Sequence, residues 1–182
     1  MSEDEDQALV EACRGGNRAA FAALVTRYQR TLYNAAYRVL GNAEDARDIV
    51  QVVFIRVLER LDEYDPEYRF FSWIYRIAIN ESISLLRRHG HDEPLDDRFD
   101  PVAPDDANPE TALQHSQVAD RIQGALLRMK ANDRVVLTLR HFSDCSYREM
   151  ADILAVDEKT VKSRLFEARG RLAALLQDFQ GN

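Results

Sequence analysis

The sequence is poor in cysteine, and it has no apolar stretch long enough to cross a membrane. Cys13 and Cys145 are its only cysteines in 182 residues, and they lie far apart. This spacing argues against a disulfide framework and predicts two free, buried thiols. No apolar run reaches the roughly eighteen residues of a membrane helix. The N-terminal MSEDEDQ is acidic rather than signal-like. Together these features predict a soluble, cytoplasmic protein without membrane insertion.

Strand patterns and catalytic groupings are also missing. No stretch alternates apolar and polar residues as a half-buried strand would, so the fold class is predicted to be all-α. His89 and His91 lie close together but without nearby cysteines, which favours loop residues over metal ligands. The chain shows no nucleophile–base pair. The sequence therefore predicts no metal, no cofactor and no enzymatic activity.

Acidic charge is concentrated in one segment. The net charge of −7 would argue against nucleic-acid binding, but the charge is not evenly distributed along the chain. Residues 91–120 carry nine acidic side chains and one basic, whereas residues 121–182 carry eleven basic and eight acidic. The overall sign is thus a poor guide to partners.

The acidic segment also marks a domain boundary. Residues 90–108 contain three prolines, many aspartates and few apolar residues, a composition typical of a flexible linker. This predicts two small helical domains, residues 1–89 and residues 109–182, joined by an acidic tether.

Caps and periodic apolar residues predict four helices before the linker. Asn17 and Asn42 are predicted N-caps, Gly41 a C-terminal stop, and Ser72 the cap of the fourth helix. The third helix repeats apolar residues at the helical period, so all of them are expected in the core: Ala46, Ile49, Val50, Val53, Phe54, Val57, Leu58 and Leu61.

A helix-turn-helix is predicted from Ser143 to Leu176. Ser146 and Glu149 have the spacing of a capping box, Ala155 begins a three-residue break, and Asp157 is a good cap for a longer helix. The second helix of this motif usually enters a DNA major groove.

The outer face of that second helix suits DNA. Val161, Leu165, Ala168 and Leu172 fall on the inward side, and the opposite side carries Lys159, Lys162, Ser163, Phe166 and Glu167. Such side chains can contact phosphates, base edges and a thymine methyl. The alternative is a solvated helix in a helical hairpin, but the capping box, the turn length and the basic face together favour DNA binding.

The third helix is predicted to bind a protein. Opposite its core stripe, Val52 and Ile55 lie among Glu44, Asp45, Asp48 and Gln51. An apolar centre with an acidic rim can dock a basic partner helix. Scattered exposed apolar residues are the ordinary alternative.

The fourth helix is predicted to contact unpaired DNA. A narrow arc of its surface carries Trp73, Arg76, Asn80, Ile83 and Arg87, and the preceding loop adds Tyr64, Tyr68 and Phe70. Aromatic rings can stack unpaired bases, and guanidinium groups can hold phosphates. The alternative is that Trp73 is a core residue and the arginines are solvated.

Three segments, in this order, resemble the extracytoplasmic-function (ECF) class of bacterial RNA polymerase sigma factors. The segment AEDARDIVQVVF (residues 43–54) is similar to the family's polymerase-binding helix. FFSWIYRIAIN (residues 70–80) is similar to its promoter-melting segment. SYREMADIL followed by TVKSRL is similar to its reader of the upstream promoter element.

The resemblance carries some of these residues over by position. Asp48, Gln51 and Phe54 match the family's pattern around the clamp contact; Trp73, Tyr75, Arg76 and Asn80 match its downstream-element (−10) segment; Lys162, Ser163, Phe166 and Glu167 match its upstream-element (−35) reader. Together with the helix faces above, this predicts three sites. The clamp helices of the polymerase's largest subunit would bind Asp45, Asp48, Gln51, Val52 and Ile55. The downstream element would contact Tyr64, Trp73, Tyr75, Arg76, Asn80, Ile83 and Arg87. The upstream element would contact Lys159, Lys162, Ser163, Phe166 and Glu167.

The sequence departs from the family at three positions. Val52 stands where an acidic residue is common, so apolar packing should contribute more to clamp binding. Ala155 replaces a frequent glycine, which is tolerated outside the left-handed region of backbone space. Glu167 replaces a residue that is often basic, and its carboxylate would accept from a cytosine amino group.

The resulting prediction is a sigma factor that brings core polymerase to specific promoters and assists their melting, in a stress or envelope response. The resemblance also implies an anti-sigma partner. The alternative is an ordinary helix-turn-helix regulator of duplex DNA. A further hypothesis is that the acidic tether covers the basic faces of the free protein and weakens DNA binding.

Overall fold

A computed structural model describes residues 3–90 and 109–178 of the chain. All regular structure in these two ranges is helical, as the sequence predicts. The helices, in order, are α1 (Glu3–Arg14), α2 (Arg18–Leu40), α3 (Ala43–Arg60), the short 3₁₀ helix η1 (Leu61–Glu63), α4 (Phe70–Arg88), α5 (Pro109–Leu127), α6 (Ala131–His141), α7 (Tyr147–Leu154) and α8 (Glu158–Asp178). Most of the acidic tether, and the hypothesis about its charge, fall outside the described residues.

Asparagine caps set the starts of the two central helices of the first domain. The Asn17 side chain accepts hydrogen bonds from the backbone N–H groups of Ala19 and Ala20, at 3.0 and 3.2 Å. Asn42 does the same at the start of α3, at 2.8 and 3.0 Å. Both predicted caps are confirmed. They satisfy N–H groups that the first turn of a helix leaves without partners.

Gly41 ends α2 and lets the second domain approach. Its φ of 74° places it in the left-handed region, and its N–H donates to the Tyr37 carbonyl at 2.8 Å. A Cβ built at this position would lie 2.6 Å from the Leu127 methyl groups of α5. A side chain here would therefore meet both backbone strain and a steric clash.

Two predictions about the first domain are wrong. Ser72 does not cap α4, because the helix already begins at Phe70 and Arg69 holds the cap position. Ser72 is instead 2% exposed inside the first turn. Leu58 was expected in the core but is 57% exposed. The apolar repeat of α3 is wider than the face that α2 and α4 cover, so its edge reaches the surface.

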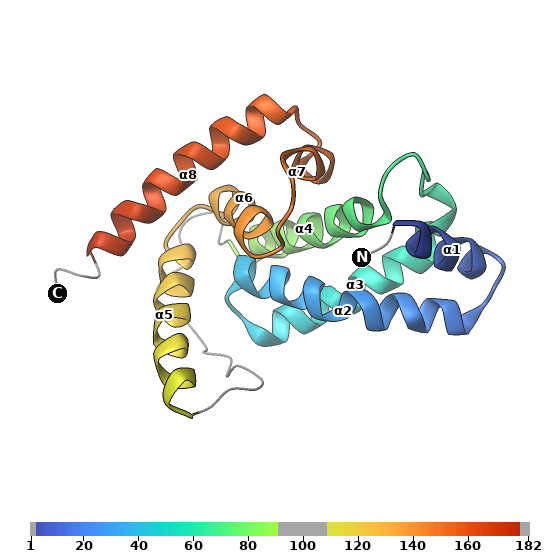
Figure 1. The fold of residues 1–182 in the computed structure, drawn as a ribbon, viewed down its shortest axis with the longest axis horizontal. Helices are drawn as coiled ribbons and strands as arrows, with labels where there is room; N and C mark the ends of the chain where they lie inside the picture. The colour runs from blue at the N-terminus through green and yellow to red at the C-terminus, as the bar shows by residue number, and fades with distance from the viewer. Residues whose placement is uncertain (1–2, 91–108, 179–182) are drawn as a thin grey trace.

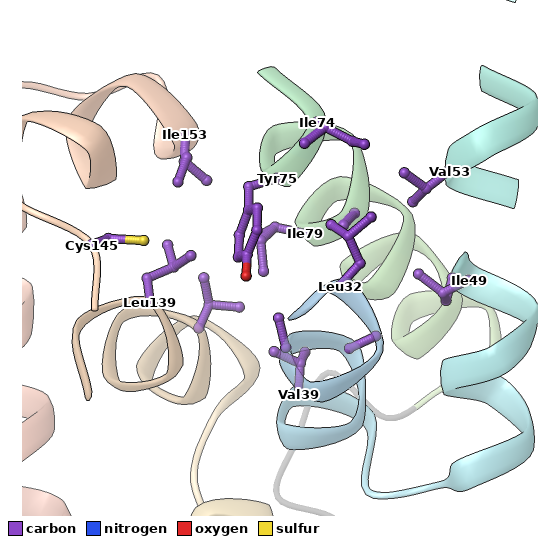
Figure 2. Packing of buried hydrophobic residues seen from close by; sticks show 14 of the residues in the cluster. Leu32, Val39, Ile49, Val53, Ile74, Tyr75, Ile79, Leu139, Cys145 and Ile153 are labelled. Atoms are coloured by element: carbon purple, nitrogen blue, oxygen red, sulfur yellow. The ribbon is translucent and has the colours of Figure 1, made fainter. Parts of the chain in front are cut away.

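The two domains pack against each other and share a core. Figure 1 shows α7 beside α4, and α6 lying between α2 and α8; close contacts join α4 to α7 and α2 to α6. One cluster of buried apolar residues runs from the first domain into the second, including Tyr75, Leu139 and Ile153 (Figure 2). Sequence periodicity predicts the helices but not this packing, because it does not say which helices meet.

Candidate nucleic-acid interface

The helix-turn-helix has the caps that the sequence predicts. The Ser146 hydroxyl accepts from the Glu149 N–H at 3.2 Å, and the Glu149 carboxylate accepts from the Ser146 N–H at 2.8 Å. Asp157 accepts from the Thr160 N–H at 2.6 Å at the start of α8, and this hydrogen bonding lowers the pKa of the Asp157 carboxyl. Both helices therefore begin at capped, well-defined positions.

The turn between these helices departs from the sequence-based expectation. Ala155 has φ 52° and ψ 46°, so it adopts the left-handed conformation that the substitution of glycine by alanine was expected to avoid. Its N–H donates to the Ala151 carbonyl and closes α7. This conformation is sterically unfavourable for a residue with a Cβ. It turns the chain from α7 into α8.

The outer face of α8 is open to solvent. Val161, Leu165 and Ala168 are buried, as expected, and all five predicted DNA contacts are exposed: Lys159, Lys162, Ser163, Phe166 and Glu167. The Phe166 side chain is 80% exposed. A phenylalanine this exposed gains nothing from the fold, which supports contact with another molecule.

An ion-pair network holds Glu167. Arg171 donates to the Glu167 carboxylate at 2.9 Å and to both carboxylate oxygens of Asp133 on α6, at 2.8 and 2.9 Å. These two carboxylates raise the pKa of Arg171. Arg171 thus neutralises part of the negative charge that Glu167 would bring to DNA. Sequence reasoning missed Asp133 and Arg171, although the spacing of Glu167 and Arg171 is that of a helical ion pair.

The predicted aromatic contacts on the first domain are largely buried. Tyr64 and Tyr75 are 2% and 1% exposed, and burial raises the pKa of both hydroxyls. Tyr64 donates to the Tyr68 carbonyl at 2.7 Å. Trp73 is half-buried, with its ring 5.5 Å from Tyr64 and 5.7 Å from Phe70. The structure brings this aromatic group together at the start of α4.

The second domain covers the start of the predicted downstream-element surface. Arg76 donates to the Asp152 carbonyl of α7, and Arg69 forms an ion pair with Glu149 of the same helix. A cleft of about 560 Å³ remains between the two domains; its lining includes Trp73, Arg76, Ala155 and Asp157. Farther along α4, the predicted contacts Asn80 and Arg87 are exposed and Ile83 is half-buried.

The predicted polymerase-binding face of α3 is exposed along its length. Asp48, Gln51 and Ile55 are exposed, and Asp45 and Val52 are half-buried. Ile55 is 54% exposed, and the exposed Leu58 extends the apolar patch by nearly one turn. Leu58 was missed because its position in the apolar repeat indicated the core.

The described residues contain no group of three potential His, Cys, Asp or Glu metal ligands. Within the same ranges, no helix is both long and apolar enough to span a bilayer.

Comparison with known families matches both domains. The Sigma-70 region 2 model matches residues 24–91, and the Sigma-70 region 4 model matches residues 119–172. The chain is 30% identical to the RNA polymerase sigma-H factor of Pseudomonas aeruginosa, over 97% of this chain and 96% of that protein. It is 31% identical to the ECF RNA polymerase sigma factor SigW of Bacillus subtilis, over 93% and 95%.

Two solved structures share the fold. CnrH in complex with the cytosolic domain of CnrY has a TM-score of 0.72 and 27% identity, with 96% of this chain and 98% of that chain covered. The sigma factor RpoE in complex with the anti-sigma factor NepR, from Bartonella quintana, has a TM-score of 0.68 and 22% identity, covering 86% and 96%.

Proposed function

Because the chain belongs to the extracytoplasmic-function class of sigma factors, which direct RNA polymerase to specific promoters, we propose a division of labour between its domains. Residues 1–89 bind core polymerase and the downstream promoter element, and residues 109–182 bind the upstream element. The match of a region 2 model to the first domain disfavours an ordinary helix-turn-helix regulator, which has no need of such a domain. The protein contributes binding, and the polymerase carries out the chemistry in the cytoplasm.

The proposed upstream-element site rests on the exposed face of α8. Its lysines are placed for phosphates, Ser163 and Glu167 for base edges, and Phe166 for a thymine methyl. The described part of the fold leaves the Phe166 ring 80% exposed. A DNA groove would bury this ring.

The proposed polymerase-binding site rests on the exposed patch on α3. Ile55 and Leu58 form an apolar centre, and Asp45, Asp48 and Gln51 lie beside it. This arrangement fits the basic and apolar face of a partner helix, here the clamp helices of the largest polymerase subunit. The α4 surface, with Trp73, Arg76 and Asn80, then faces the melted strand.

We also propose that an anti-sigma factor binds this protein. The support is the shared fold with RpoE, which was solved in complex with the anti-sigma factor NepR, and with CnrH, which was solved in complex with the cytosolic domain of CnrY. The likeness extends over both domains of the chain, so a partner of that kind could contact both.

Matched variants test the division of labour. The purified protein should associate with core polymerase and direct run-off transcription from its promoter. Ile55→Glu should weaken association about thirty-fold or more, because loss of a central anchor commonly costs about 2 kcal/mol or more and the new carboxylate would be buried without a partner. Phe166→Ala should keep association and lose transcripts. If the wild-type protein neither associates with core enzyme nor directs transcription, the proposal is wrong; full association by Ile55→Glu would remove α3 from it.

A further inference from the structure

We propose that Arg171 is a positioning residue for base recognition by Glu167. It acts through the Glu167 carboxylate and does not touch the base, and Asp133 of α6 holds it in place. This inference rests on the proposed function of α8 as the reader of the upstream element. It adds that recognition of one base pair depends on three side chains from two helices.

A glutamate on a DNA-facing helix needs a partner if it is to read a base. The phosphate backbone repels its carboxylate, and ordering its flexible side chain on one base costs entropy. Arg171 reduces both costs, because its Nη2 donates to the Glu167 carboxylate at 2.9 Å. The two residues are four apart on α8 with the glutamate first, which is the favourable order for a helical ion pair.

The ion pair uses one carboxylate oxygen of Glu167 and leaves the other for DNA. Arg171 donates to Oε2, and Oε1 accepts no hydrogen bond from the described residues. A cytosine amino group offers one N–H to the major groove, because base pairing uses the other. One free oxygen is therefore enough to accept from cytosine, and Arg171 does not compete with the base.

Asp133 fixes the direction of Arg171 from a second helix. Nη1 of Arg171 donates to both carboxylate oxygens of Asp133, at 2.8 and 2.9 Å. Asp133 lies in the first turn of α6, where the helix dipole favours a carboxylate, and its side chain is only 14% exposed. Because α6 packs closely on α8, the packing of these two helices sets where the Arg171 guanidinium lies.

A second cation makes the choice of partner matter. Asp133, Glu167 and Arg171 line one groove of about 650 Å³ between the start of α6 and α8, and Arg164 lines it too. Arg164 precedes Glu167 by three residues, a spacing at which helical side chains can also pair. In the structure Glu167 pairs with Arg171 instead. Without Arg171, the carboxylate is free to turn toward Arg164 and away from the position from which it reads the base.

Arg169 provides a matched control on the same helix. Its Nε donates to Nε2 of His141 at 3.2 Å, so it too joins α8 to α6. Within the described part of the chain it makes no hydrogen bond or ion pair with Glu167. Arg169→Met therefore removes a cation and a link between the same two helices, as Arg171→Met does, but leaves the partner of Glu167 in place.

The test measures base preference in the holoenzyme, assembled from core polymerase and the full-length chain. Run-off transcription from a template library varied through the upstream element gives the preference for cytosine at each base pair, and Glu167→Gln identifies the pair that Glu167 reads. At that pair alone, Arg171→Met should lower the preference about two- to five-fold, the range expected for one exposed ion pair. Asp133→Asn should lower it less, because Arg171 still reaches Glu167 but loses its anchor.

Two further variants separate positioning from a general structural role. Arg171→Lys should restore part of the preference that Arg171→Met loses, because an ammonium keeps the charge but lacks the planar fork that joins two carboxylates. In a Glu167→Ala background, Arg171→Met should not change the preference at all. Arg169→Met should leave the preference as in the wild type, even if it weakens transcription from all sequences alike.

The outcomes distinguish this inference from the function on which it rests. A shifted preference in Glu167→Gln but not in Arg171→Met would overturn the positioning role. Equal weakening of all sequences by Arg171→Met would also overturn it, because that is the behaviour of a phosphate contact. A wild-type holoenzyme without base preference anywhere in the upstream element would instead contradict the proposed function of α8.

Discussion

The two proposed DNA-binding surfaces differ in what covers them. The outer face of α8 is bare, with Phe166 80% exposed. On α4, Tyr75 is 1% exposed, Trp73 is half-buried, and Arg76 is bound to α7. The proposed upstream-element surface is thus exposed, whereas the second domain covers the start of the proposed downstream-element surface and leaves Asn80 and Arg87 exposed.

The largest expected effect is on the free energy of unfolding, to which the covered surface should contribute far more than the exposed one. Tyr75→Ala removes a fully buried ring and should lower the free energy of unfolding by about 3–5 kcal/mol. Phe166→Ala removes an exposed ring and should change it by less than about 0.5 kcal/mol. Chemical denaturation followed by circular dichroism measures both. A small loss for Tyr75→Ala would mean that the domain interface contributes little, and the comparison would fail.

Local structure was largely predictable from the sequence because its causes are local. Asn17, Asn42, Ser146 and Asp157 act on N–H groups two or three residues away, so spacing alone identifies them. The outer face of α8 follows equally from the helical period. Ser72 was misassigned because α4 begins three residues earlier than a cap at Ser72 would allow, and the burial of Phe70 and Phe71 in that added turn outweighs a serine cap.

The arrangement of the domains was not predictable in the same way. The stripe on α4 was predicted to face away from its own domain, and Asn80 and Arg87 are exposed, whereas Trp73 packs on Tyr64 and Phe70 of that domain. Periodicity also does not show that Arg76 meets α7. The prediction that Leu58 is buried is wrong for the converse reason, because none of the described residues covers this edge of α3. Ion pairs such as Arg69–Glu149 join residues far apart in sequence, and no local pattern predicts them.

A smaller expected effect concerns base specificity on the outer face of α8. Glu167→Gln replaces an acceptor by a group that both donates and accepts, which should shift preference at one upstream base pair from cytosine toward adenine by about 1–3 kcal/mol. Run-off transcription from a library varied through the upstream element measures it. Lys159→Ala is the control, because loss of a phosphate contact should weaken all sequences alike. Unchanged base preference in Glu167→Gln would remove Glu167 from base recognition.

The smallest expected effect concerns Ala155, in the turn between α7 and α8. Ala155 has φ 52°, and a left-handed residue with a Cβ costs about 1–2 kcal/mol, of which glycine's greater freedom in the unfolded chain offsets about 0.5–1 kcal/mol. Ala155→Gly should therefore stabilise the protein by up to about 1 kcal/mol, measured by denaturation. Ala173→Gly, on the exposed side of α8, should destabilise it by about 1 kcal/mol. An unchanged or lower free energy of unfolding in Ala155→Gly would contradict the steric cost assigned to this turn.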